Sequence, residues 1–148
     1  MSYSILVENS KTNNISHKSL KLRIYPNQEQ KGLIDKTFGC CRKLYNEHLQ
    51  EKNEFYIENI LPVKNKITEK EKKEIYKTFK PKTEKEWKVV YPYLTEVSST
   101  SLQQARMDCD NAFVNFFKSN KGTRKGKFGF PKFKSKKDNH QSYRTKCK

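Results

Sequence analysis

The residues of this sequence that could carry chemistry are mainly lysines and aromatic side chains gathered near the C-terminus. Residues 119–148 hold eleven Lys or Arg against one acid, so they supply +10 of the net charge of +16. Lysines attract phosphates whatever the base sequence, because contact releases condensed counterions. The interleaved aromatic rings either stack on unpaired bases or face a core as strand residues. The candidate nucleic-acid-binding residues here are Lys125, Lys127, Lys132, Phe133, Lys134, Lys136, Lys137, Tyr143 and Arg144.

A second candidate pair, Gln104 and Arg106, lies on the polar side of a predicted helix. Gln and Arg side chains can read base edges in a groove. Because helix surfaces commonly carry these two residue types, an ordinary solvated face is the simpler interpretation. Base-edge contact by Gln104 and Arg106 remains the alternative.

Catalytic and metal-binding patterns give no comparable signal. Asp108 and Asp110 are two residues apart on a predicted helix, so they point about 200° from one another and do not converge on one ion. The four cysteines contain no Cys-x-x-Cys pair, which a tetrahedral zinc site would favour. Cys41 and Cys109 fall on apolar helical stripes and are expected to be structural. We therefore expect no catalytic residue, no metal ligand and no cofactor on this chain.

The elements that position these residues follow from local patterns. Residues 19–25 alternate apolar and polar side chains, which predicts a strand. Asn27 with Gln30 predicts a helix start, and an apolar stripe of period three to four continues to Tyr56, with Gly39 inside it as the expected site of a close helix–helix contact. Further helices are predicted after Thr68, after Thr83 and from Ser98 or Ser99. From residue 119 onward we expect a mobile basic segment with a strand-like part at 141–145.

Composition limits the fold class. Hydrophobic residues make up 33% of the 148 residues, so the core must be small. The sequence has no apolar run of eighteen residues, so a membrane span is not expected. We expect a mainly helical α+β protein that is cytoplasmic or nucleoid-associated, with no membrane partner.

Four blocks of sequence, taken in order, resemble the TnpB/OrfB family of transposon-encoded proteins, which are related to type V CRISPR effectors. They are LKLRIYPNQEQ at 20–30, TFGCCR at 37–42 with Tyr45-Asn46, LTEVSSTSLQQA at 94–105 with the phenylalanines that follow, and GFPKFKSKK at 129–137 with QSYRT at 141–145. Residues 1–17 lie outside the resemblance.

The resemblance implies an RNA-guided DNA endonuclease whose partners are guide RNA and DNA. It implies a domain order: a flexible extension at 1–16, the first strand of a wedge barrel at 17–26, an inserted helical recognition region at 27–118, and a basic return to the incomplete barrel at 119–148. Older descriptions of the family call its N-terminal helices a helix-turn-helix. The family's RuvC-like nuclease domain and four-cysteine zinc element lie further along than residue 148, so the divalent metal and zinc they need are not expected here.

This resemblance leaves the enzyme activity of the chain open. The chain is interpreted as a nucleic-acid-binding N-terminal part of a TnpB/OrfB-like transposase that does not cut by itself. Two alternatives remain: a free-standing basic RNA- or DNA-binding regulatory module, and one half of a nuclease whose RuvC-like half is separately encoded.

Overall fold

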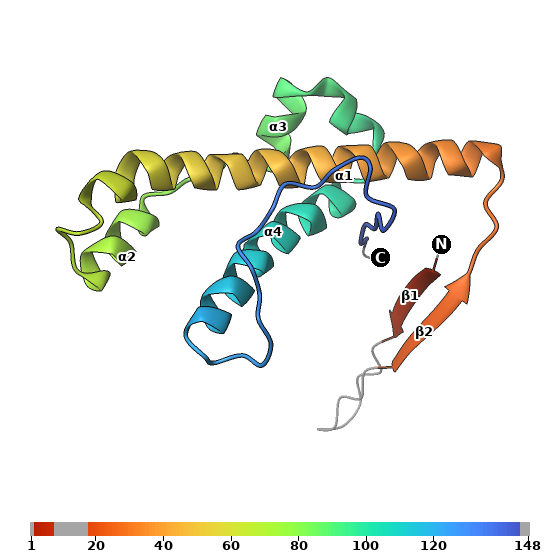
Figure 1. The fold of residues 1–148 in the computed structure, drawn as a ribbon. Coiled ribbons are helices and arrows are strands. Elements are labelled where there is room, and N and C mark those ends of the chain that lie inside the picture. Colours follow the sequence, from red (N-terminus) through yellow and green to blue (C-terminus); the bar gives the residue numbers. More distant parts are fainter. Residues whose placement is uncertain (1, 8–17, 146–148) are drawn as a thin grey trace. The chain divides into compact units, whose positions relative to one another are not determined.

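The computed structural model describes residues 2–7 and 18–145, and it divides the chain into two compact units, residues 1–32 and 33–148. Figure 1 shows the elements in chain order, and most of them are helices. The mainly helical fold expected from the sequence is therefore confirmed. Among the described residues, none of the helices combines the length and apolar character needed to cross a membrane.

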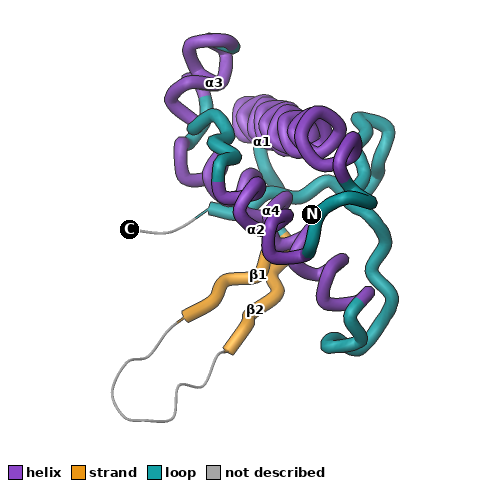
Figure 2. Tube along the Cα trace, turned by 90° about the vertical axis from the view of Figure 1, so that its left-hand side faces the viewer, coloured by secondary structure: helices purple, strands orange, loops and turns teal. Residues whose placement is uncertain are grey.

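The first unit contains a two-stranded antiparallel sheet (Figure 2). Strand β1 (Ser2–Val7) pairs with β2 (Lys18–Arg23), with Ser2 opposite Arg23 and Val7 opposite Lys18. β2 confirms the predicted strand. β1 was not predicted, because its short apolar stretch is preceded and followed by polar residues and does not alternate over a full strand, although its partner β2 is the next element of the chain. The rest of the expected flexible extension, residues 8–17, lies outside the described residues.

Helix α1 (Gln28–Phe55) begins at the predicted capping box. The Asn27 amide donates to Gln30 Oε1 at 3.0 Å, and the Gln30 amide donates to Asn27 Oδ1 at 2.8 Å. This exchange satisfies two backbone donors that a helix start leaves free. α1 is followed by a π-helical turn η1 (Tyr56–Ile60) and a 3₁₀ turn η2 (Leu61–Val63) at Pro62.

Helices α2 (Glu69–Lys77) and α3 (Glu84–Val90) both start at complete capping boxes, Thr68 with Glu71 and Thr83 with Glu86. The 3₁₀ turn η3 (Pro92–Glu96) follows α3 and leads into the long helix α4 (Ser99–Asn120). The predicted helix starts are thus confirmed. Those of α1, α2 and α3 depend on residues only three positions apart, whereas Ser98 at the start of α4 forms no side-chain cap bond.

The core of the second unit lies between α1, α3, η3 and α4. Its main cluster joins Cys40, Cys41, Leu44, Trp87, Leu94, Val97, Leu102 and Ala105. A smaller cluster joins Tyr45, Leu49 and Cys109, with Phe113 packed against it. α1 and α4 contribute most of these side chains, which agrees with their predicted apolar stripes.

Two expectations from the sequence are wrong. Gly39 does not mark a close helix–helix contact, because a Cβ there would meet only the Arg42 guanidinium, at 4.0 Å. Residues 121–145 also contain no strand, and they are not detached from the helices. They form an extended segment, here called the strap, which runs along α4 and crosses α1 (Figure 1). The described residues therefore hold a two-stranded sheet and no barrel.

Candidate nucleic-acid interface

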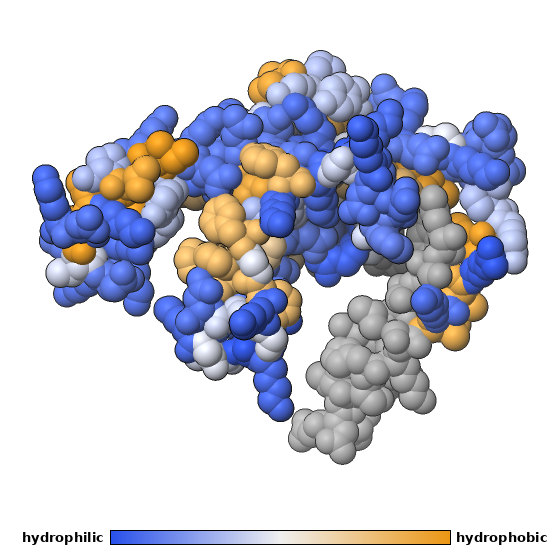
Figure 3. All heavy atoms as spheres, viewed as in Figure 1, coloured by the Kyte–Doolittle hydropathy of each residue, from blue (hydrophilic) through white to orange (hydrophobic). Residues whose placement is uncertain are grey.

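The first anchor of the strap is aromatic. The Phe130 ring packs edge-on against Phe113 and Phe116 of α4, with centroids 5.5 and 5.4 Å away and interplanar angles of 89° and 84°. The following residue, Pro131, is buried. Figure 3 shows apolar side chains gathered over the C-terminal half of α4, with hydrophilic surface around them. Since edge-to-face pairs add about 0.5–1.5 kcal/mol each beyond burial, this contact fixes Phe130 to the protein.

The second anchor is Asn46 of α1, which holds the backbone of Lys134 from both sides. Asn46 Oδ1 accepts from the Lys134 amide at 2.8 Å, and Asn46 Nδ2 donates to the Lys134 carbonyl at 3.0 Å. The Lys134 ammonium lies 4.4 Å from the centre of the Tyr45 ring. Tyr45 and Asn46 of the second sequence block therefore contact Lys134 of the fourth block. The sequence alone did not reveal this contact.

Replacing Asn46 with alanine is expected to release this part of the strap. Both hydrogen bonds disappear, and two net bonds together are worth about 2 kcal/mol, so the Lys134 amide should exchange with solvent at least ten times faster. Hydrogen exchange read by mass spectrometry measures this directly. The matched control is Asn53→Ala, also on α1. Unchanged exchange at Lys134 in Asn46→Ala would show that other contacts hold the strap.

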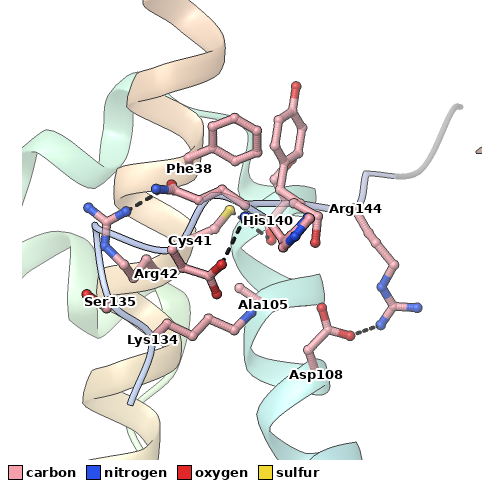
Figure 4. A pocket seen from close by; sticks show the side chains of 14 residues that line it. Phe38, Cys41, Arg42, Ala105, Asp108, Lys134, Ser135, His140 and Arg144 are labelled. Carbon is pink, nitrogen blue, oxygen red and sulfur yellow. Dashed lines mark hydrogen bonds and ion pairs between the residues drawn. The ribbon is translucent and has the colours of Figure 1, made fainter. Parts of the chain in front are cut away.

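The third anchor surrounds a cavity of about 80 Å³ between α1, α4 and the end of the strap (Figure 4). Tyr143 packs edge-on against Phe38, with ring centroids 5.5 Å apart. Arg42 donates to Gln141 Oε1 at 3.1 Å, and Arg144 forms an ion pair with Asp108. Tyr143 and Arg144, both predicted to bind nucleic acid, therefore make contacts within the protein. Whether they also bind nucleic acid stays a prediction.

Most of the strap lysines remain available. Lys125, Lys127, Lys132, Lys136 and Lys137 are exposed, and within the described part of the chain their side chains form no ion pair or hydrogen bond. The backbone that carries them is held by the three anchors. The Phe133 side chain is 55% exposed, and its ring does not pack against another aromatic ring of the described residues. This arrangement offers phosphates a row of unpaired cations on a fixed support.

Gln104 and Arg106 are less accessible than expected for groove-reading residues. Gln104 is only 7% exposed and its amide lies 3.7 Å from the Met107 sulfur. Arg106 Nε donates to Glu84 Oε1 at 2.7 Å and so ties α4 to α3. Their contacts agree with a structural role, and their binding of bases stays a prediction.

The acids of α4 point apart, as their spacing predicts. Asp108 pairs with Arg144, whereas Asp110 accepts from His48 Nε2 at 2.8 Å and from Lys52 Nζ at 2.6 Å. His48 is 1% exposed, and its position on the apolar stripe of α1, four residues after Leu44, was a signal of burial that the sequence analysis missed. No group of three or more His, Cys, Asp or Glu within the described ranges is placed to hold a metal ion.

The Asp110 contacts predict an acid-dependent stability. Burial disfavours the charged carboxylate, but the hydrogen bonds from His48 and Lys52 outweigh it and lower the pKa of Asp110 from 3.8 to about 2. A lowered pKa in the folded state stabilises the fold above the unfolded value, and this contribution is lost as the pH falls from about 4 toward 2. Asp110→Asn should therefore be less stable than wild type at pH 6, with a smaller change in stability between pH 4 and 2.

Urea unfolding at pH 6, 4, 3 and 2 measures that dependence. The control is Asp35→Asn, which removes an exposed carboxylate of α1 and should keep the wild-type profile. Identical profiles for Asp110→Asn and wild type would contradict the stabilising role of this carboxylate.

The described cysteines are core residues. Burial raises the pKa of both Cys41 and Cys109 to about 12, so both thiols stay protonated and unreactive at neutral pH. Cys40, whose burial the sequence analysis did not foresee, also has a raised pKa because of desolvation. The structural role predicted for Cys41 and Cys109 is confirmed. Cys147 lies outside the described residues.

Comparison with known proteins supplies the family. Residues 16–60 match a family model described as a helix-turn-helix domain, of the OrfB/IS605 type. A Streptomyces pristinaespiralis protein named "Putative RNA-guided DNA endonuclease" is 30% identical over 127 residues, which are 84% of this chain. The chain is TnpB/OrfB-like. This confirms the resemblance that the four sequence blocks carry, although the chain spans only 27% of the length of that relative.

In this TnpB/OrfB-like chain, the range matched by the helix-turn-helix model is dominated by one long helix. Its described part consists of β2, the continuous 28-residue helix α1 and the turn η1. The strap residue Lys134 contacts α1 inside this range, at Asn46. The matched range therefore supplies part of the surface that holds the strap, and α4 supplies the rest.

Proposed function

We propose that this TnpB/OrfB-like chain binds nucleic acid through the strap, and that the strap lysines supply most of the affinity. The observation that supports this proposal is that the five candidate lysines, and Lys121 beside them, are exposed and have no side-chain partner among the described residues, on a backbone anchored by Phe130, Asn46 and Tyr143. A fixed row of cations binds a phosphate chain at a smaller entropic cost than a mobile one.

The ligand class proposed is single-stranded or structured RNA, with DNA as a second partner. The relative is named an RNA-guided DNA endonuclease, so a guide RNA is the natural ligand of a family member. The exposed Phe133 ring supports this choice, because an aromatic face stacks only on unpaired bases. Phosphate contacts position a ligand without identifying its bases, so we expect weak base-sequence preference.

We further propose that β2 and the strap are parts of a wedge barrel whose remaining strands come from elsewhere in a full-length family member. The apolar side chains of β2, Leu20 and Leu22, are 56% and 45% exposed, which is what an incompletely covered barrel strand would show. A strand gains its ladder only with a partner, so the strap would become a strand only in that larger assembly.

This chain by itself is proposed not to cut DNA. Its helix acids are engaged in separate ion pairs, so they do not converge as phosphodiester hydrolysis with metal ions requires. A regulatory module and one half of a split nuclease remain compatible with the same binding surface.

Fluorescence anisotropy of labelled single-stranded RNA with the purified chain tests the proposal. At a slope of about 0.7 per single-strand contact, six to ten phosphate contacts should reduce affinity by about 300-fold to 20,000-fold between 50 and 200 mM salt. Binding that is absent at 50 mM salt, or that does not change with salt, would contradict the proposal. A separate assay tests the proposal that this chain does not cut DNA by itself. Incubation with plasmid DNA, guide RNA and Mg²⁺ should give no cleavage. Cleavage that follows the protein through purification would contradict that proposal.

A further inference from the structure

The described residues offer no explanation for the glycine in the middle of α1. Gly39 lowers helix stability by about 1 kcal/mol relative to alanine. A helix interior normally accepts this cost where another backbone approaches closely, yet a Cβ at Gly39 would have open space apart from the Arg42 guanidinium at 4.0 Å. The open space is therefore available to a group that comes from outside the protein.

The space above Gly39 is part of an open groove of about 490 Å³ between α1 and η3. Four of the side chains that line it carry charge: Lys36, Arg42 and Lys43 of α1, and Glu96 at the end of η3. The aromatic ring of Tyr93 lines the same groove and is 45% exposed. The groove thus has a net positive lining, an exposed ring and, at Gly39, a wall without a side chain.

Two of the three cations of this groove, Lys36 and Arg42, can turn to a ligand at little cost. Lys36 lies 2.6 Å from Glu96, but the two side chains are 63% and 50% exposed, and such surface pairs contribute only about 0–1 kcal/mol. Arg42 gives a hydrogen bond to the neutral Gln141 of the strap at 3.1 Å, which leaves other guanidinium N–H groups free. The strap thereby holds Arg42 beside Gly39. The third cation, Lys43, forms an ion pair with Glu47, in which Nζ lies 2.5 Å from Oε1.

We propose that this groove binds the sugar–phosphate backbone of a single-stranded nucleic acid, with a phosphate above Gly39. Arg42 and Lys36 contact the phosphate oxygens, and the Tyr93 ring stacks on a neighbouring base. The absent side chain lets the phosphate approach the helix surface closely. This inference rests on the proposed function and adds to it a second contact region, separate from the strap lysines.

The experiment compares the two glycines of α1. Gly32 also has open space around its Cβ position, so Gly32→Leu is a matched control for Gly39→Leu. Leucine favours helix, and thermal melts should show both variants folded and at least as stable as wild type. Anisotropy with labelled single-stranded RNA at 100 mM salt should show about tenfold weaker binding for Gly39→Leu and wild-type binding for Gly32→Leu.

A second pair of variants adds no bulk to the helix. Lys36→Gln should lower the slope of log K against log salt by about 0.7, which corresponds to one single-strand phosphate contact, whereas Lys31→Gln should leave it unchanged. Wild-type binding by both Gly39→Leu and Lys36→Gln, with salt-dependent binding intact, would overturn this inference and leave the strap proposal standing. Wild-type protein without salt-dependent binding would overturn the proposed function, and this inference with it.

Discussion

Neutralising the five candidate lysines of the strap is expected to remove most of the salt dependence of RNA binding. In the variant Lys125→Gln, Lys127→Gln, Lys132→Gln, Lys136→Gln and Lys137→Gln, up to five phosphate contacts are lost. Each single-strand contact contributes about 0.7 to the slope of log K against log salt, so the slope should fall by about 3.5. Between 50 and 200 mM salt, the affinity of wild type should therefore drop about 100-fold more than that of the variant.

A matched variant tests whether the salt dependence comes from lysines at the strap or from the total charge of the protein. Lys64, Lys66, Lys70, Lys73 and Lys85 are also exposed, and five glutamines there change the net charge by the same amount. This control should keep a slope close to that of wild type. Equal slopes for the two variants would mean that overall charge, and not the strap, governs binding.

Replacing Leu102 with alanine is expected to lower the free energy of unfolding by about 3 kcal/mol. Leu102 is 0% exposed and belongs to the main core cluster between α1 and α4. Truncation removes buried methyl groups and leaves a cavity, and such changes cost about 2–5 kcal/mol in other cores. In a chain with only 33% hydrophobic residues, few other contacts can compensate.

Urea unfolding followed by circular dichroism measures this loss. Val89→Ala on α3 is the control, because Val89 is 82% exposed and should change stability by less than about 0.5 kcal/mol. A loss below about 1 kcal/mol for Leu102→Ala would contradict the placement of α4 against the core.

The local parts of the fold could be predicted from the sequence. The three capping boxes join residues three positions apart, and each appears in the structure as hydrogen bonds of 2.7 to 3.4 Å. The apolar stripes of α1 and α4 were also predictable, because a buried helix face repeats every three to four residues.

The support of the candidate site could not be predicted, because its contacts join distant residues. Asn46 and Lys134 are 88 positions apart, and Arg42 and Gln141 are 99 apart. Each bond depends on α1, α4 and the strap being assembled first, and a single sequence carries no signal for that. The high charge of the strap suggested a segment without contacts to the helices, whereas the structure shows aromatic and amide contacts from the strap to α1 and α4.

Lysine footprinting of the wild-type chain tests the central claim most directly. Acetylation of all lysines, with and without single-stranded RNA, is read residue by residue by mass spectrometry. The strap account predicts strong protection of Lys125, Lys127, Lys132, Lys136 and Lys137 by RNA, and unchanged reactivity of Lys66, Lys70 and Lys73. Protection of the latter three with no protection of the strap lysines would contradict it.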